Sequence, residues 1–366
     1  MKLGVEAALV DGRLVPGDVQ VSGGRVVGVG RTSASGRGIA VPGFVDLQVN
    51  GFAGVDLLGA DAGGYRRAGE ALLETGVTSY LATFITAPEE HIVDALQALQ
   101  ALPPSGTGPR LLGAHLEGPF LSPRRLGIHP AGARRDPDVG LLERLLAAGP
   151  VRLVTLAPEL EGADALVERL LRSEIAISCG HSDATAEEAE CAFDLGVRTV
   201  THLFNAMRPF RHRDPGIAGA ALARDDVIVQ LILDGVHLAR ETASVVWRAA
   251  AGRVALVTDA MAGAGLGDGT HHLGGLEIEI VDGVARGPDG QLAGSTLTML
   301  EAVRNLHALG ASLEDAVGAA SEVPARILRN PSIGRIAVGL PADILVLTDE
   351  LELERVLVEG TDRVAL

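Results

Sequence analysis

The sequence has 366 residues, of which 47% are hydrophobic, and a formal net charge of −16 at pH 7. The length suits one large barrel with a small satellite domain. The negative charge argues against nucleic acids and anionic membranes as partners, because both select a basic surface. The sequence contains neither an apolar run of about 18 residues nor a signal-peptide pattern, so we expect a soluble, cytoplasmic protein.

Two residue counts exclude further kinds of chemistry. Cys179 and Cys191 are the two cysteines and do not form a Cys-x-x-Cys pattern, so neither a disulfide framework nor a zinc knuckle is expected. Lys2 is the only lysine in the sequence. The body of the chain therefore contains neither a Schiff-base lysine nor a carboxylated lysine that bridges two metals.

The two ends of the chain predict short antiparallel strands. Before Pro42, the segments VEAALVDGRLV and DVQVSGGRVVGVG alternate apolar and polar residues around turn glycines, as hairpins do. The C-terminal segment has the same character, after a helical stretch near residues 312–329. We predict that residues 1–42 and 332–366 pair into one small β-sandwich.

Between these ends, short strands alternate with helices. This is the pattern of repeated β-α units around a parallel sheet. Helical stretches such as TAEEAECAFDLG, which ends on Gly196, separate the strands. Eight units predict an α/β fold, a (β/α)8 TIM-type barrel over residues 43–331. The predicted strands cover residues 43–49, 79–85, 110–117, 151–157, 174–181, 198–202, 227–233 and 253–259.

Four side chains that handle metals or protons close four of these strands, namely Glu117, His181, His202 and Asp259. Active sites of such barrels lie at the carboxyl ends of the strands. A single histidine there is more often merely hydrogen-bonded, and Asp259 alone could cap a helix, although the glycine-rich AMAGAGLGDG that follows is a poor helix former. Together the four favour a hydrolase with a divalent metal such as zinc and an open position for water.

Longer segments carry a family resemblance. VPGFVDLQVNG, LGAHLEGPFLSPRRLGIHP, VTLAPE, CGHSDAT, THLFNAMRP, DGVHL, VTDAMAGAG, LAGSTLTM and GLPADILVL occur in this order, nearly end to end. They resemble the N-acetylglucosamine-6-phosphate deacetylase family of the amidohydrolase superfamily. The resemblance implies a hydrolase that converts N-acetylglucosamine 6-phosphate to glucosamine 6-phosphate and acetate. A relative acting on N-acetylgalactosamine 6-phosphate would have similar segments.

The resemblance also implies roles for the residues at the strand ends. Glu117, His181 and His202 would hold one divalent metal. Zinc is the expected metal, with iron, manganese and cobalt as alternatives. Water on the metal would attack the acetamide carbonyl, and Asp259 would take its proton and pass it to the leaving amine. His129 would stabilise the oxyanion; its other interpretation is a turn histidine before a proline.

Further positions match the contacts of the family with the sugar phosphate. A guanidinium can pair bidentately with phosphate, which favours Arg213 for that role, although a solvated arginine in a basic cluster is an open alternative. In the family, part of the phosphate site comes from a second subunit, which implies a homodimer, with His237 as the shared residue. The matched positions are Asn205, Ala206, Arg213, His237, Leu292, Ala293 and Gly294.

One departure from the superfamily bears on the number of metals. Many members have His-x-His at the end of the first strand, whereas this chain has Gln48, Val49 and Asn50. Amides are weak zinc ligands, so we expect one metal, with Gln48 bonding the water or marking a second-site position. His271 and His272 match no family role and are expected in a glycine-rich loop, either exposed or in a mobile flap.

Two other functions are weighed against deacetylation. A cyclic-amide hydrolase of the same superfamily commonly uses His-x-His and a bridging lysine, and this sequence has neither. A catalytically silent barrel used for binding or assembly would have lost the metal ligands or Asp259, which are all present. The expected partner is therefore a small phosphorylated N-acetyl amino sugar.

Overall fold

The computed structural model describes residues 1–30, 36–103 and 108–365. Within this part of the chain, eight parallel strands form one sheet in the order β15-β14-β13-β12-β11-β10-β9-β6, so each strand pairs with its neighbours in sequence. The two edge strands approach where Val49 bridges Ala260, which nearly closes the barrel. The strands are β6 (Phe44–Val49), β9 (Val77–Ile85), β10 (Arg110–Glu117), β11 (Val151–Leu156), β12 (Ala176–Cys179), β13 (Thr199–Val200), β14 (Ile228–Leu231) and β15 (Val254–Leu256).

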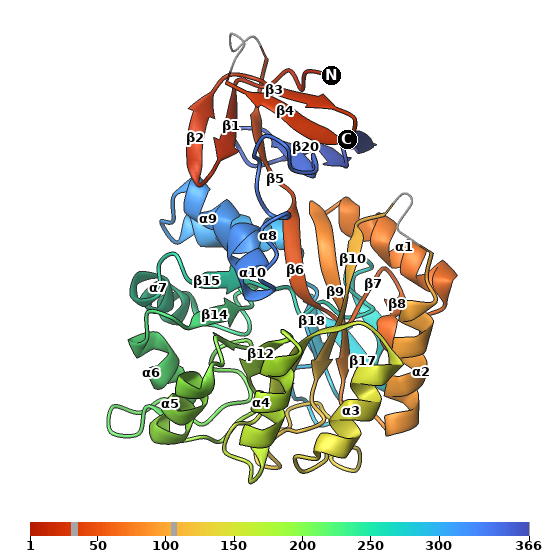
Figure 1. Ribbon diagram of the computed structural model, residues 1–366, viewed down its shortest axis with the longest axis vertical. Helices are drawn as coiled ribbons and strands as arrows, with labels where there is room; N and C mark the ends of the chain where they lie inside the picture. Colours follow the sequence, from red (N-terminus) through yellow and green to blue (C-terminus); the bar gives the residue numbers. More distant parts are fainter. Residues whose placement is uncertain (31–35, 104–107, 366) are drawn as a thin grey trace.

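Helices follow the strands and cover the outside of the barrel (Figure 1). Each buries one apolar stripe against the sheet, as in α4, where Leu166, Val167 and Leu170 are buried. The predicted stop of α5 is confirmed, because Gly196 caps it with a φ of 122°. The helices are α1 (Ala62–Leu73), α2 (Glu89–Gln100), α3 (Val139–Ala148), α4 (Ala163–Arg172), α5 (Ala186–Leu195), α6 (Gly216–Ala223), α7 (Arg240–Ala249), α8 (Met299–Ala308), α9 (Leu313–Ala320) and α10 (Glu322–Ile327).

The two ends of the chain meet in a separate sheet beside the barrel, where red and blue strands lie together in Figure 1. Its order is β2-β1-β5-β19-β20-β21, and the hairpin of β3 and β4 packs on it around a second apolar core. The predicted β-sandwich fold is therefore confirmed, whereas its boundaries at residues 42 and 332 stay a prediction. The strands are β1 (Ala7–Val10), β2 (Arg13–Pro16), β3 (Val19–Ser22), β4 (Arg25–Val29), β5 (Ile39–Pro42), β19 (Ile344–Leu347), β20 (Leu353–Val358) and β21 (Thr361–Ala365).

A three-stranded antiparallel sheet stands where the sequence predicts a glycine-rich loop. β16 (Gly269–Leu273) pairs with β17 (Leu276–Val281), which pairs with β18 (Val284–Arg286). One face of this sheet packs on Met261 and Ile85 as a third apolar cluster. His271 is half-buried and His272 is exposed, and both lie in β16, so the prediction of a loop at these positions is wrong.

The remaining short elements are a hairpin of β7 (Gly51–Phe52) and β8 (Val55–Asp56) and the turn η1 (Leu57–Gly59), all between β6 and α1. Among the helices of the described residues, none has the length and apolar composition that crossing a membrane requires.

Candidate active site

The four predicted side chains gather at the carboxyl end of the barrel. Glu117 is the last residue of β10, while His181, His202 and Asp259 lie two or three residues beyond the ends of β12, β13 and β15. These three residues have left-handed backbone angles, with φ of 49°, 29° and 51°. The strands therefore end before the residue ranges predicted for them, because a left-handed residue interrupts the hydrogen bonding between strands. The same conformation directs the side chain toward the open end of the barrel.

Three of these side chains approach one another as a set of metal ligands does. Glu117 Oε1 lies 3.2 Å from His181 Nε2 and 2.9 Å from His202 Nε2, and the two Nε2 atoms are 3.1 Å apart. A tetrahedral zinc ion with bonds of about 2.0–2.1 Å separates its ligand atoms by about 3.3 Å. The three atoms thus have nearly the spacing of one face of that tetrahedron.

The hydrogen bonding of the His181 ring also fits a metal. His181 Nδ1 lies 2.9 Å from the backbone oxygen of Arg125, so Nδ1 carries the proton and the Nε2 lone pair faces Glu117. Burial opposes ionisation of Glu117, but the adjacent imidazoles of His129, His181 and His202 outweigh it and hold the pKa of Glu117 well below its usual range. A charged carboxylate and two imidazole lone pairs are ligands that zinc prefers.

His129 lies close enough to compete for the third ligand position. Glu117, His129 and His181 have ligand atoms within 4.8 Å of one another. However, the Thr86 N–H donates to His129 Nδ1 at 3.2 Å, so a neutral His129 carries its proton on Nε2 and has no lone pair there for a metal. Burial and the neighbouring His181 lower the pKa of His129 to about 4, which keeps the ring neutral at pH 7. The hydrogen bonding thus favours His202 as the third ligand and His129 as a donor.

Asp259 is held by two amide side chains. Gln48 Nε2 donates to Asp259 Oδ1 at 3.0 Å and to Glu117 Oε1 at 3.1 Å, and Asn50 Nδ2 donates to Asp259 Oδ1 at 2.7 Å. Burial and the charge of Glu117 raise the pKa of Asp259 to about 7. The carboxyl group is thus anchored through Oδ1 and titrates near neutrality, where an acid–base catalyst works best.

Asn50 is a site residue to which the sequence analysis gave no role. It lies two residues after Gln48, so the alternation of a strand points both side chains to the same side, and this was the available signal. The prediction was that Gln48 bonds the metal-bound water or marks a second-site position; in the structure, both amides are hydrogen-bond donors to carboxylates.

A cavity of about 240 Å³ opens over these side chains. Of the positions matched to sugar-phosphate contacts, Asn205, Ala206, His237, Leu292 and Gly294 line it. The other lining residues are Glu117, His129, His181, His202, Asp259, Asn50, Gln291, Ile85, Gly127, Ile128, Ile232 and Leu273. Ala293 is buried in the apolar cluster under β16 to β18, Gln48 lies beneath Asp259, and Arg213 is exposed and outside the cavity wall.

His237 is the cationic candidate inside this cavity. Its Nδ1 lies 2.7 Å from Asp234 Oδ2. Burial opposes protonation of the ring, but the hydrogen bond to Asp234 outweighs it and raises the pKa of His237 above its ordinary value. The ring therefore offers Nε2 to the cavity with an increased share of positive charge.

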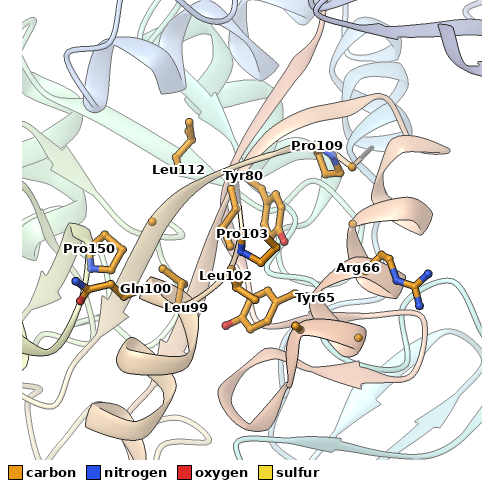
Figure 2. Close-up of a pocket in the computed structure, with 16 residues that line it drawn as sticks. Tyr65, Arg66, Tyr80, Leu99, Gln100, Leu102, Pro103, Pro109, Leu112 and Pro150 are labelled. Atoms are coloured by element: carbon orange, nitrogen blue, oxygen red, sulfur yellow. The ribbon is translucent and has the colours of Figure 1, made fainter. Parts of the chain in front are cut away.

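A larger cavity of about 630 Å³ lies between α1, the end of α2 and the first residues of β9 and β10 (Figure 2). Tyr65 of α1 and Tyr80 of β9 point into it, and Leu99, Leu102 and Pro109 wall it. Its strand residues lie near the starts of β9 and β10, and none of the described residues that line it is a histidine or a carboxylate. Size alone would select this cavity, but the polar groups that chemistry requires converge in the smaller one.

The chain is similar to known proteins along most of its length, and residues 39–361 match the model of the amidohydrolase family. The N-acetylglucosamine-6-phosphate deacetylase of Homo sapiens is 39% identical over 379 residues, which cover 95% of this chain and 92% of the relative. The N-acetylgalactosamine-6-phosphate deacetylase of Escherichia coli O157:H7 is 35% identical, with coverage of 87% and 86%.

Solved structures agree with these relatives. The N-acetyl-D-glucosamine-6-phosphate deacetylase of Mycobacterium smegmatis, solved as a mutant in complex with N-acetyl-D-glucosamine 6-phosphate, has a TM-score of 0.93 and 36% identity and covers 100% of this chain and 99% of its own. Fold, site geometry and sequence thus point the same way. The chain belongs to the N-acetylglucosamine-6-phosphate deacetylase family of the amidohydrolases.

Proposed function

We propose that the protein hydrolyses the acetamide of N-acetylglucosamine 6-phosphate and releases glucosamine 6-phosphate and acetate. One observation carries the proposal: a ligand triangle of Glu117, His181 and His202 lies beside Asp259 in a single cavity. The human relative, named for this activity, matches 95% of the chain.

Glu117, His181 and His202 would hold one zinc ion, with iron, manganese or cobalt as alternatives. When bound, the ion supplies a Lewis acid and lowers the pKa of a water molecule toward neutrality. Gln48 donates to both Glu117 and Asp259, and this hydrogen bond fixes the metal ligand and the base relative to each other.

Asp259 serves as base and then as acid. Its Oδ1 is occupied by the amides of Gln48 and Asn50, so Oδ2 is the oxygen available to the reaction. The carboxylate accepts a proton as water adds to the acetyl carbon, and the carboxyl group returns this proton to the sugar nitrogen as the C–N bond breaks.

His129 stabilises the negative charge that develops on the acetyl oxygen. Because its Nδ1 accepts from Thr86, its Nε2–H is a fixed donor within the cavity. A donor that is already oriented costs no rearrangement when charge develops, which lowers the barrier.

The sugar phosphate would lie against Asn205, Ala206, His237, Leu292 and Gly294, which line the cavity. Ala293 is buried in the adjoining apolar cluster. His237, with its raised pKa, is the cationic side chain among them that suits a phosphate or a sugar hydroxyl.

Arg213 would contact phosphate across a homodimer interface. Its side chain is exposed and lies outside its own cavity, on the segment that continues from Asn205 and Ala206. His237, by contrast, lines the cavity of its own chain. These placements favour Arg213 over His237 as the residue that reaches the partner's site.

A cytoplasmic location also stays a prediction.

N-acetylgalactosamine 6-phosphate is the second candidate substrate, because the relative from Escherichia coli O157:H7 is named for it and is 35% identical. Acetate release measured with both epimers and with unphosphorylated N-acetylglucosamine, alongside metal analysis, tests the proposal. We expect turnover of a phosphorylated sugar and one bound metal per chain. A protein with neither turnover nor bound metal would instead be a catalytically silent binding module. Equal rates on N-acetylglucosamine and its 6-phosphate would contradict the role of Arg213 in binding phosphate.

A further inference from the structure

Asp183 is a half-buried acid for which deacetylation gives no role. It lies two residues after His181 in the GHSDAT segment, and its side chain is 10% exposed. Arg125 Nε donates to its Oδ1 at 2.7 Å, and Arg124 and Arg208 approach its Oδ2 at 3.2 and 3.7 Å.

The chief partner of Asp183 also touches His181. The backbone oxygen of Arg125 accepts the hydrogen bond from His181 Nδ1 at 2.9 Å. This contact fixes which ring nitrogen carries the proton and therefore which one faces Glu117. Arg125 thus contacts Asp183 through its side chain and His181 through its main chain.

These contacts close a ring. It runs from the His181 imidazole to the Arg125 carbonyl, along the Arg125 side chain to Asp183, and back along the main chain to His181. Residues 118–138, which are all described, form neither helix nor strand, so no regular element fixes the Arg125 carbonyl. A carbonyl on an irregular loop needs such anchors to keep its direction.

The acceptor side of the ring is itself held in place. The Asp183 N–H donates to Glu159 Oε1 at 2.6 Å, and the Ser182 hydroxyl donates to Glu159 Oε2 at 2.8 Å. The position of Asp183 is therefore fixed by hydrogen bonds that do not involve Arg125. Its carboxylate can in turn fix the position of the Arg125 side chain.

We propose that Asp183 is a positioning residue for the metal site, which orients His181 through the side chain and carbonyl of Arg125. The inference rests on the proposed metal ligands and goes beyond them, because Asp183 touches neither the metal position nor the cavity. Loss of an outer hydrogen-bond partner of a metal-binding histidine typically weakens metal binding about 10–100-fold.

The test measures zinc affinity of the metal-free protein by competition with a chromophoric chelator. We expect Asp183→Asn and Arg125→Met each to raise the zinc Kd, by up to the roughly tenfold that loss of a direct partner of the histidine causes. Both substitutions act through the same ring of contacts. The zinc Kd of the double variant should therefore be no higher than that of the single variant with the higher Kd. Cobalt added to the same proteins should give altered visible absorption in both variants, since that spectrum reports ligand geometry.

Two control variants separate positioning from general destabilisation. Arg124→Gln removes an exposed partner of Asp183 whose carbonyl does not hold His181, and Thr185→Ala removes the cap of α5 two residues further on. We expect Thr185→Ala to lower the Tm, and both controls to keep the wild-type zinc Kd and cobalt spectrum.

Four outcomes would overturn a proposal. Unchanged zinc affinity and cobalt spectra in Asp183→Asn and Arg125→Met sink the role of Asp183, as does a loss that Thr185→Ala reproduces or one that adds fully in the double variant. A wild-type protein without zinc affinity instead removes the metal site of the proposed function.

Discussion

At the scale of single residues, the site depends on backbone conformations that side chains disfavour. A left-handed conformation costs a residue with a β-carbon about 1–2 kcal/mol, and His181, His202 and Asp259 all adopt it. Flanking hydrogen bonds hold two of them: the Ser122 N–H donates to the His181 oxygen at 2.9 Å, and the Ser295 N–H donates to the Asp259 oxygen at 2.8 Å. The surrounding loops therefore stabilise strained positions that aim the functional groups inward.

Asp259→Asn tests the proton chemistry at this scale. The amide can neither accept the proton of the attacking water nor return it, so kcat should fall about 10²–10⁴-fold. Metal content and KM should stay close to wild type, because Asp259 is not one of the proposed ligands. Steady-state kinetics and metal analysis check this, and a variant with near wild-type turnover would take Asp259 out of the mechanism.

The sequence predicts which residues meet at the site better than what each contacts. Glu117 ends a strand, and His181 and Asp259 follow the ends of two others within three residues, so topology alone brings them together. The bond from Asn50 to Asp259, and the ring through Arg125, depend on loop paths that no periodicity encodes. Such contacts join positions far apart in the chain and follow only from three-dimensional packing.

At the scale of elements, Asp46 joins the two edge strands of the barrel. Its Oδ2 accepts from the Thr258 hydroxyl at 2.6 Å, and its Oδ1 accepts from the Gln48 and Thr258 N–H groups. Burial nevertheless raises the pKa of Asp46 from 3.8 to about 6. The folded state therefore binds a proton here more tightly than the unfolded chain does.

This shift predicts a pH-dependent effect of Asp46→Asn on stability. Protonation of Asp46 favours the folded state, and this contribution is complete below pH 3.8 and is lost as pH rises through about 6. Between these limits the wild type should lose up to about 3 kcal/mol of unfolding free energy relative to the variant, which cannot titrate. Denaturant unfolding of both proteins at pH 4 and pH 7 checks this; a difference that stays constant with pH contradicts it.

Element prediction succeeded in the barrel and failed at β16 to β18. The barrel strands are continuous apolar runs that repeat with helices, a pattern that leaves few alternatives. In β17 the buried residues Ile278 and Ile280 alternate with exposed glutamates, which is a clear strand signal. The surrounding glycines obscured it, because they mark turns between the strands rather than one long loop.

At the scale of the whole molecule, the proposed role of Arg213 in the partner's site can be tested by mixing subunits. Arg213→Ala and Asp259→Asn should each be nearly inactive alone. A mixed dimer would contain one site with an intact Asp259 and an Arg213 supplied by the partner, so random re-association should restore about a quarter of wild-type activity. Mixtures that stay inactive although mass measurement shows mixed dimers would place Arg213 in its own subunit's site or outside the site.

The terminal sheet can form only after nearly the whole chain has been synthesised. β5 pairs with β19, although the whole barrel lies between them in the chain. At about 5–20 residues per second, the ribosome delivers β19 roughly 15–60 s after β5, whereas each barrel strand finds its sequence neighbour within seconds. The edge of β5 therefore stays unpaired until translation is nearly complete, and nascent chains that stall before β19 would present that open edge to chaperones or to other chains.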